Sequence, residues 1–94
     1  MISVDLVFTA LSDPTRRKLL ATLAEQGNAS ASGLANTSNI SRQAIAKHLV
    51  ALENAGLVTR HKLGKEMVFA AEPSQLAATG RWLQRTADRW QQPN

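Results

Sequence analysis

The residues with the clearest capacity for specific chemistry lie in one short stretch, from Ser41 to Lys47. Arg42 can donate two parallel hydrogen bonds to guanine, Gln43 can pair in the same manner with adenine, and Ala44 can contact the methyl group of thymine. Lys47 follows Gln43 by about one helical turn. Ser41 can donate to a phosphate, and a helix that starts there offers the same anion free N–H groups and a positive dipole end. Chemistry of this kind recognises double-stranded DNA.

Positive charge is concentrated around these residues. The whole chain has a formal net charge of +4 over 94 residues. Between Arg42 and Lys65 the only acidic residue is Glu53, whereas the remainder of the chain is close to balanced. The basic residues and histidines of this segment are Arg42, Lys47, His48, Arg60, His61, Lys62 and Lys65. A local positive field favours a polyanionic partner, which agrees with the recognition of nucleic acid.

Composition excludes several other classes of function. The sequence contains no cysteine, so it can form neither a disulfide framework nor a thiolate metal site. Its carboxylates are scattered and no nucleophile has a base beside it, so we expect no enzyme, no catalytic residue and no cofactor. No apolar run reaches the roughly 18 residues of a membrane span, and the start of the chain does not read as a leader peptide. We therefore expect a cytoplasmic protein with no membrane partner.

These side chains need a scaffold, and the sequence predicts a single domain over 1–94 that is mainly α with a minor β component. Asp13 and Ser41 are suited to cap helices, Ser30 or Ser32 can cap a short one, and glycines mark helix ends. The elements expected in chain order are a helix through 4–11, a helix from 14 that stops near 27, a short helix through 34 and 35, a helix from 41 to 56, strands at 57–62 and 66–71, and a helix from 73 through 90.

This order (α-α-α-α-β-β-α) describes a winged helix-turn-helix, with a tight turn at 36–39 before the fourth helix. A helix is about 10–12 Å across and fits a DNA major groove that is about 12 Å wide. The hairpin, or wing, bends around 63–65, where Gly64 can adopt the positive φ that such a bend needs. Its cations, on or near the tip, can reach phosphates or the minor groove. They are Arg60, His61, Lys62 and Lys65.

The last helix carries an apolar line of a different kind. Leu76, Gly80, Leu83, Ala87 and Trp90 are separated alternately by four and three residues, which is the spacing of a seam between two paired helices. We therefore favour dimerisation through this line. The same residues can alternatively line a pocket for an effector.

Three longer segments carry a family likeness: Phe8–Arg17, Ser41–Leu49 and Leu52–Val58. They resemble the ArsR family of winged-helix repressors, and the likeness extends over nearly the whole chain without insertions. The resemblance implies a homodimer joined through the first and last helices, a fourth helix that reads DNA, and release from the operator by an effector such as a small molecule. The interface residues that it implies are Val4, Phe8, Leu76, Leu83, Ala87 and Trp90.

The resemblance also indicates which effector to exclude. Metal-sensing members of the family use cysteines on the third helix, or carboxylates and histidines on the last one. Here Gly33 and Asn36 stand on the third helix, while the last helix has Asp88 as its only acid and contains no histidine. We therefore expect no metal site and a place in the branch that does not sense metals.

Other interpretations of the same residues stay open. His48 can sense pH or bind a metal, although a single histidine inside a helix-turn-helix more often serves the structure. The run Arg16–Lys18 can contact the DNA backbone, although a charge run is more often a solvated face. The alternative function is a winged-helix module that binds protein instead of DNA. Such a module favours exposed apolar or acidic residues on the fourth helix and hairpin, where this chain is basic.

Overall fold

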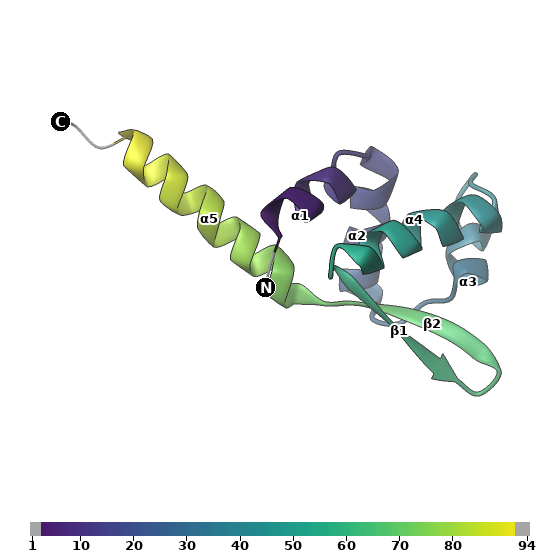
Figure 1. The fold of residues 1–94 in the computed structure, drawn as a ribbon. Coiled ribbons are helices and arrows are strands. Elements are labelled where there is room, and N and C mark those ends of the chain that lie inside the picture. The colour runs from purple at the N-terminus through teal and green to yellow at the C-terminus, as the bar shows by residue number, and fades with distance from the viewer. Residues whose placement is uncertain (1–2, 92–94) are drawn as a thin grey trace.

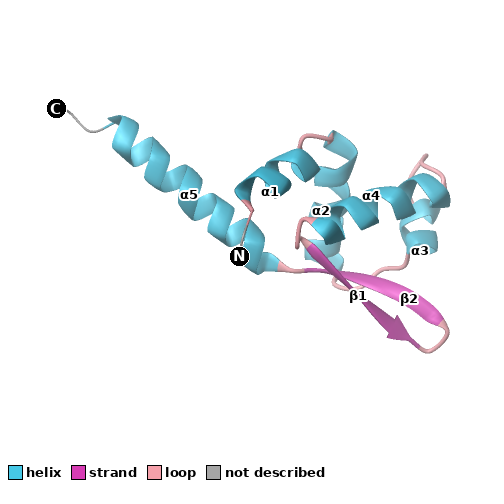
Figure 2. Ribbon diagram, in the orientation of Figure 1, coloured by secondary structure: helices cyan, strands magenta, loops and turns pink. Residues whose placement is uncertain are grey.

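The computed structural model describes residues 3–91 of the chain, and its elements follow the predicted order (Figures 1 and 2). A body of helices and one hairpin is followed by a long last helix that runs away from it. The elements are α1 (Val4–Leu11), α2 (Pro14–Gln26), α3 (Ala31–Asn36), α4 (Arg42–Asn54), β1 (Val58–Leu63), β2 (Glu66–Ala71) and α5 (Pro73–Gln91). None of the helices found in residues 3–91 combines the length and the apolar character needed to span a membrane.

Four helices begin at a side chain that accepts hydrogen bonds from their first turn. Asp13 caps α2 by accepting from the backbone N–H groups of Thr15 and Arg16. Ser30 caps α3 and Ser41 caps α4, and α1 begins in the same way at Ser3. Because an oxygen at this position satisfies an N–H group that has no partner within the helix, these residues define where each helix starts. Of the two predicted caps for α3, Ser30 is the one used.

Two glycines end α2 and separate α4 from the hairpin. Gly27 has φ +89° and Gly56 has φ +75°, a conformation that residues with a Cβ adopt only at a cost. At Gly56 there is a second reason, because a Cβ there would lie 2.8 Å from Cγ of Gln75 at the start of α5. The helix α4 ends at Asn54, two residues before the predicted boundary, and residues 55–57 form the turn into β1.

The core surrounds the inner face of α4. Ile45, Leu49 and Leu52 are fully buried there and belong to one hydrophobic cluster that includes side chains from every element of the body. Their spacing of three and four residues places them on one side of the helix, so the opposite side is left facing outward. The buried cluster consists of Val7, Ala10, Leu19, Leu20, Leu23, Leu34, Ile45, Leu49, Leu52, Ala55, Leu57, Val58 and Phe69. Burial therefore determines which residues of α4 can meet a partner.

The hairpin is an antiparallel pair in which Val58 lies opposite Ala71 and Leu63 lies opposite Glu66. Strand β1 extends through Leu63, so the connection is Gly64 and Lys65 alone, with Gly64 at φ +65°. The predicted three-residue bend at 63–65 was one residue too long. Ala29, before α3, exchanges backbone hydrogen bonds of 3.0 and 2.8 Å with Phe69. This bridge attaches the base of the wing to the body.

Candidate nucleic-acid interface

The outer face of α4 carries the side chains that the sequence singled out for base recognition. Arg42, Gln43 and Lys47 are exposed, and Ala44 is half-buried near the start of the helix. Val50 continues the same face one turn beyond Lys47 and is 43% exposed. Val50 is not among the residues predicted from the sequence, although its spacing from Lys47 was visible there. Its branched apolar side chain can contact a thymine methyl group.

Ser41 has a local structural role as well as a place on this surface. Its Oγ accepts a hydrogen bond of 3.2 Å from the backbone N–H of Ala44, while the side chain is exposed. The hydroxyl hydrogen of a serine in this arrangement can still be donated to a phosphate. The N–H groups of the first turn of α4 point toward the same side, so the start of α4 can bind an anion.

The structure brings the start of α4 and the tip of the wing to one groove. The groove has a volume of about 330 Å³. It is lined by Ser30, Ala31, Ser32, Arg42, Gln43, Ala46, Lys65, Glu66, Met67 and Phe69. Arg42 and Lys65 are far apart in the sequence, but both line it. A nucleic-acid strand that passes over this groove would meet both cations, so the fourth helix and the wing form one surface.

The other predicted wing residues differ in their surroundings. Lys62 and His61 are exposed on β1, and the Nε2 atom of His61 lies 3.0 Å from Oγ1 of Thr59. Lys65 is exposed in the two-residue turn at the tip. A long cationic side chain at such a tip can reach phosphates on either side of a groove. His61, Lys62 and Lys65 therefore lie where the sequence placed them.

Arg60 is different, and its predicted position near the wing tip was wrong. It lies in the middle of β1, where its Nε and Nη2 atoms donate to Glu53 of α4 at 2.8 and 2.6 Å. Its guanidinium also stacks over the Phe69 ring, 5.4 Å from the centroid. The hydrogen bond from Arg60 lowers the pKa of Glu53, and Glu53 raises the pKa of Arg60. Arg60 thus joins the wing to the end of α4, and a contact with DNA stays a prediction.

The run Arg16–Lys18 is partly used inside the protein. The Nε atom of Arg16 donates to Nδ1 of His48 at 3.2 Å, which joins α2 to the inner side of α4. An Nη1 atom of Arg17 donates to the backbone oxygen of Leu11 at 2.6 Å, at the end of α1. Arg16 and Arg17 therefore support the scaffold, instead of forming a simple solvated face. The contact to Arg16 agrees with the structural interpretation of His48.

The predicted dimer residues lie on α1 and α5, and most of them are exposed. Phe8 packs edge-to-face against Trp82 with ring centroids 5.9 Å apart, which attaches α5 to α1. Trp82 lies beside the predicted apolar line, and this contact is one that only the tertiary structure reveals. Beyond it α5 extends from the body, and Trp90 is 88% exposed. The remaining predicted positions are Val4 and Ala87, which are half-buried, and Leu76 and Leu83, which are exposed.

The histidines and carboxylates are spread over the molecule. Within residues 3–91 no three of these side chains lie close enough together to hold a metal ion.

Comparisons with known proteins agree with this geometry. The model of a helix-turn-helix domain family matches residues 11–61. The Transcriptional repressor SdpR of Bacillus subtilis is 35% identical over 77 residues, which cover 82% of this chain and 84% of that protein. The HTH-type transcriptional regulator YuzN of Bacillus subtilis is 40% identical over 88 residues, covering 85% and 95% of the two chains. Both likenesses include the helix-turn-helix and most of the remaining chain.

Solved structures share the whole architecture. An ArsR-like transcriptional regulator from Rhodococcus sp. RHA1 is 45% identical, with a TM-score of 0.84 over 93% of this chain and 81% of that chain. The homodimeric winged helix-turn-helix DNA-binding domain Mb0332 from Mycobacterium bovis is 25% identical, with a TM-score of 0.72 over 95% and 82% of the two chains. The chain therefore belongs to the ArsR family of winged helix-turn-helix transcriptional regulators, which bind DNA.

Proposed function

We propose that the protein is a homodimeric repressor that binds an inverted-repeat operator. The observation that carries this proposal is the exposed surface formed by Arg42, Gln43 and Lys47 on α4 together with Lys65 on the wing. In a symmetric dimer the two α4 helices would enter successive major grooves about 34–36 Å apart. Each wing would then hold phosphates beside the groove that its own α4 reads. Occupancy of the operator would block transcription.

The dimer is supported by the exposed apolar line of α5. Leu76, Leu83 and Trp90 are exposed on this line, and large exposed apolar surfaces of this kind mark interaction sites. Their alternating spacing suits pairing with an identical helix, as part of an interface that includes Val4 and Phe8 of α1. The homodimeric Mb0332 domain supports the same assembly. Repression is supported by the likeness to the repressor SdpR.

Arg42 and Gln43 are assigned to base recognition, and Ser41, Ala44 and Lys47 to contacts beside them. Replacing Arg42 or Gln43 with alanine should weaken binding to the preferred operator by about 1–3 kcal/mol, and binding to random duplex far less. The preferred operator is obtained by selection from a random duplex library, and affinities are then measured by fluorescence anisotropy. Equal weakening on both duplexes would show that these side chains do not read bases.

Lys62 and Lys65 provide the matched comparison, because they are assigned to phosphates. Lys62→Ala or Lys65→Ala should weaken binding to every duplex alike and reduce the slope of log affinity against log salt by about 0.9 for each phosphate that is no longer neutralised. A weakening confined to the preferred operator would contradict the phosphate assignment. His61 on the same wing is expected to contribute less to phosphate binding than Lys62 or Lys65.

The cellular location and the effector class of the protein are also part of this proposal. We place the protein in the cytoplasm, together with the DNA that it binds, and in the branch of the family that does not sense metals. Gly33 and Asn36 on α3, and Asp88 on α5, support the exclusion of metal because they do not form a ligand set. Operator affinity should therefore be the same with added zinc and with a chelator. A small organic molecule is the effector class that we favour.

A further inference from the structure

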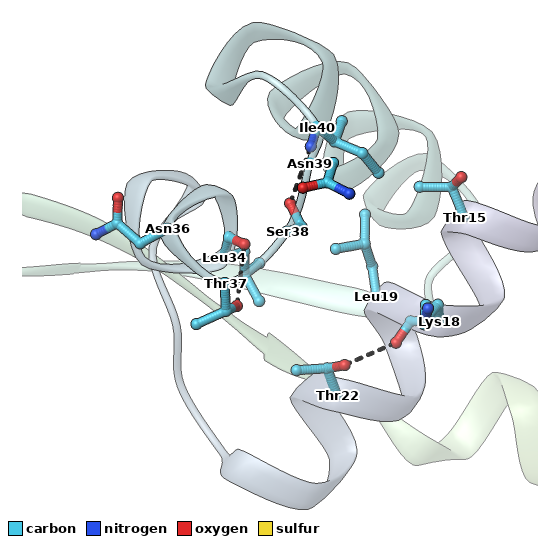
Figure 3. Close-up of a pocket in the computed structure, with 10 residues that line it drawn as sticks. All are labelled: Thr15, Lys18, Leu19, Thr22, Leu34, Asn36, Thr37, Ser38, Asn39 and Ile40. Atoms are coloured by element: carbon cyan, nitrogen blue, oxygen red, sulfur yellow. Dashed lines mark hydrogen bonds between the residues drawn. The ribbon is translucent and has the colours of Figure 1, made fainter.

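A cavity that shares no lining residue with the wing groove has no role in the function proposed above. It lies between α2 and the segment that joins α3 to α4, and has a volume of about 630 Å³. Figure 3 shows the residues that line it: Thr15, Lys18, Leu19, Thr22, Leu34, Asn36, Thr37, Ser38, Asn39 and Ile40. Pockets for small ligands typically measure about 300–1,000 Å³, so this cavity has room for a small organic molecule.

The floor of the cavity is apolar. Leu19 and Leu34 are 7% and 4% exposed and belong to the main hydrophobic cluster, and Ile40 is half-buried against it. An apolar group that enters the cavity would replace water on these three side chains, which is favourable in proportion to the area covered. The occupant therefore needs an apolar body.

The rim determines what the head of such a molecule must be. Three hydroxyl groups of the rim are engaged locally: Thr22 donates to the backbone oxygen of Lys18, Thr37 donates to that of Leu34, and Ser38 accepts from the N–H of Ile40. By contrast, within residues 3–91 the side chains of Thr15, Lys18, Asn36 and Asn39 make no hydrogen bond or ion pair with other residues.

These side chains set the charge of the ligand. An ammonium group, one hydroxyl and two amides are available as donors, and no acidic residue lines the cavity. Lys18 is therefore the only charged residue at the site. A cation would meet a charge of its own sign there, whereas an anion would find an opposite charge together with three further donors.

From this arrangement we propose that the cavity binds a small amphipathic carboxylate, with its apolar body on Leu19, Leu34 and Ile40 and its head at Lys18. The cavity wall leads directly into Ser41, which caps the recognition helix α4. A ligand that contacts both α2 and residues 36–40 holds these two parts at the separation that suits the ligand, and this shifts the start of α4 relative to the ligand-free form. The form with the start of α4 shifted binds the ligand more tightly and the operator more weakly than the unshifted form, so the ligand lowers operator affinity. This coupling to DNA rests on the proposed function, while binding of the carboxylate does not.

The test is a titration of the full ¹⁵N-labelled chain with sodium octanoate and with 4-phenylbutanoate, followed by NMR. We expect saturable shifts at residues 36–40 and on the Thr15–Thr22 face of α2, with millimolar or tighter affinity. Lys18→Gln should weaken binding about tenfold, because it removes a charge-assisted hydrogen bond. Arg85→Gln, which removes the same charge from an exposed site on α5, should leave the affinity unchanged. Acetate, which lacks the apolar body, should give no saturable shift, and 1-octanol, which lacks the charge, should bind about tenfold more weakly than octanoate.

Operator binding is measured on the same samples with and without octanoate. We expect octanoate to weaken it by about 5-fold to 150-fold, and Lys18→Gln to abolish this effect. If neither carboxylate produces saturable shifts at the cavity, the site is overturned. If, in addition, Lys18→Gln lowers the affinity of the ligand-free protein and reduces the salt slope by about 0.9, Lys18 is a DNA phosphate contact instead.

Two further outcomes separate the site from the function on which the coupling depends. Saturable shifts at the cavity with unchanged operator affinity would overturn the coupling and leave the site in place. A ligand-free chain that binds no duplex would overturn the proposed function, and the NMR titration would still decide on the cavity.

Discussion

Ser41 offers a direct way to separate the folding of the recognition helix from its contact with DNA. Its hydroxyl accepts from the backbone of Ala44 and thereby caps α4, and its exposed position faces the expected phosphate backbone. Three replacements divide these roles. Ser41→Ala removes the cap, Ser41→Asn keeps a neutral cap, and Ser41→Asp keeps the cap and adds a negative charge.

The magnitudes follow from these contacts. Loss of the cap should lower the free energy of unfolding by about 1 kcal/mol, which corresponds to about 4–8 °C in Tm for a domain of this size. Asn and Asp cap as well as Ser, so these variants should unfold close to the wild type. A carboxylate about 5 Å from a phosphate is repelled by roughly 1–3 kcal/mol at effective dielectric constants of about 80 to 20. Ser41→Asp should therefore bind DNA about 5-fold to 150-fold more weakly than Ser41→Asn.

The assays are urea unfolding, performed at one protein concentration because a dimer's apparent stability depends on concentration, and fluorescence anisotropy with random duplex DNA. The difference between Ser41→Asp and Ser41→Asn should diminish as salt is raised, since salt screens exposed charges. If Ser41→Asp binds DNA as tightly as Ser41→Asn at low salt, the start of α4 does not lie against phosphates. If Ser41→Asp is as unstable as Ser41→Ala, the hydroxyl is not the cap that the geometry indicates.

Three further predictions concern the parts of the scaffold that hold this surface. The ion pair between Glu53 and Arg60 should stabilise the fold at pH values above the ordinary carboxyl pKa, and this stabilisation should be lost as pH falls through the lowered pKa of Glu53. The Tm of Glu53→Gln should therefore differ most from that of the wild type near neutral pH and converge with it in acid. An equal difference in Tm at all pH values would contradict the pair. Trp90→Ala should raise the dimer dissociation constant at least about a hundredfold, because the proposed interface buries this exposed side chain and truncating a buried aromatic costs about 3–5 kcal/mol. An unchanged dimer in sedimentation would refute the α5 interface. Gly56→Ala should lower the free energy of unfolding in urea by about 1–2 kcal/mol through its positive φ, and adding Gln75→Ala should relieve only the further contribution of the close contact at 2.8 Å.

The order of the elements and most of the DNA-binding candidates could be predicted from the amino-acid sequence, because the signals involved are local. A cap such as Ser41 bonds an N–H group three residues away, and a bend such as that at Gly64 depends on the φ of one residue. The outer face of α4 was equally local, since the three- and four-residue spacing of Ile45, Leu49 and Leu52 left Gln43 and Lys47 to face outward. Interactions across three or four residues can be read from a sequence without knowing the fold.

Which distant groups share a surface or neutralise each other could not be predicted from the sequence and is known from the folded structure. Arg60 carries the same charge as Lys62, yet it is bound to Glu53 because the hairpin folds back against the end of α4. Ala29 pairs with Phe69, and α2 faces the segment at 36–40 across a cavity, although neither relation leaves a periodic signal in the chain. The physical reason is that such contacts depend on the angles at which helices and strands pack, which the whole buried core determines together.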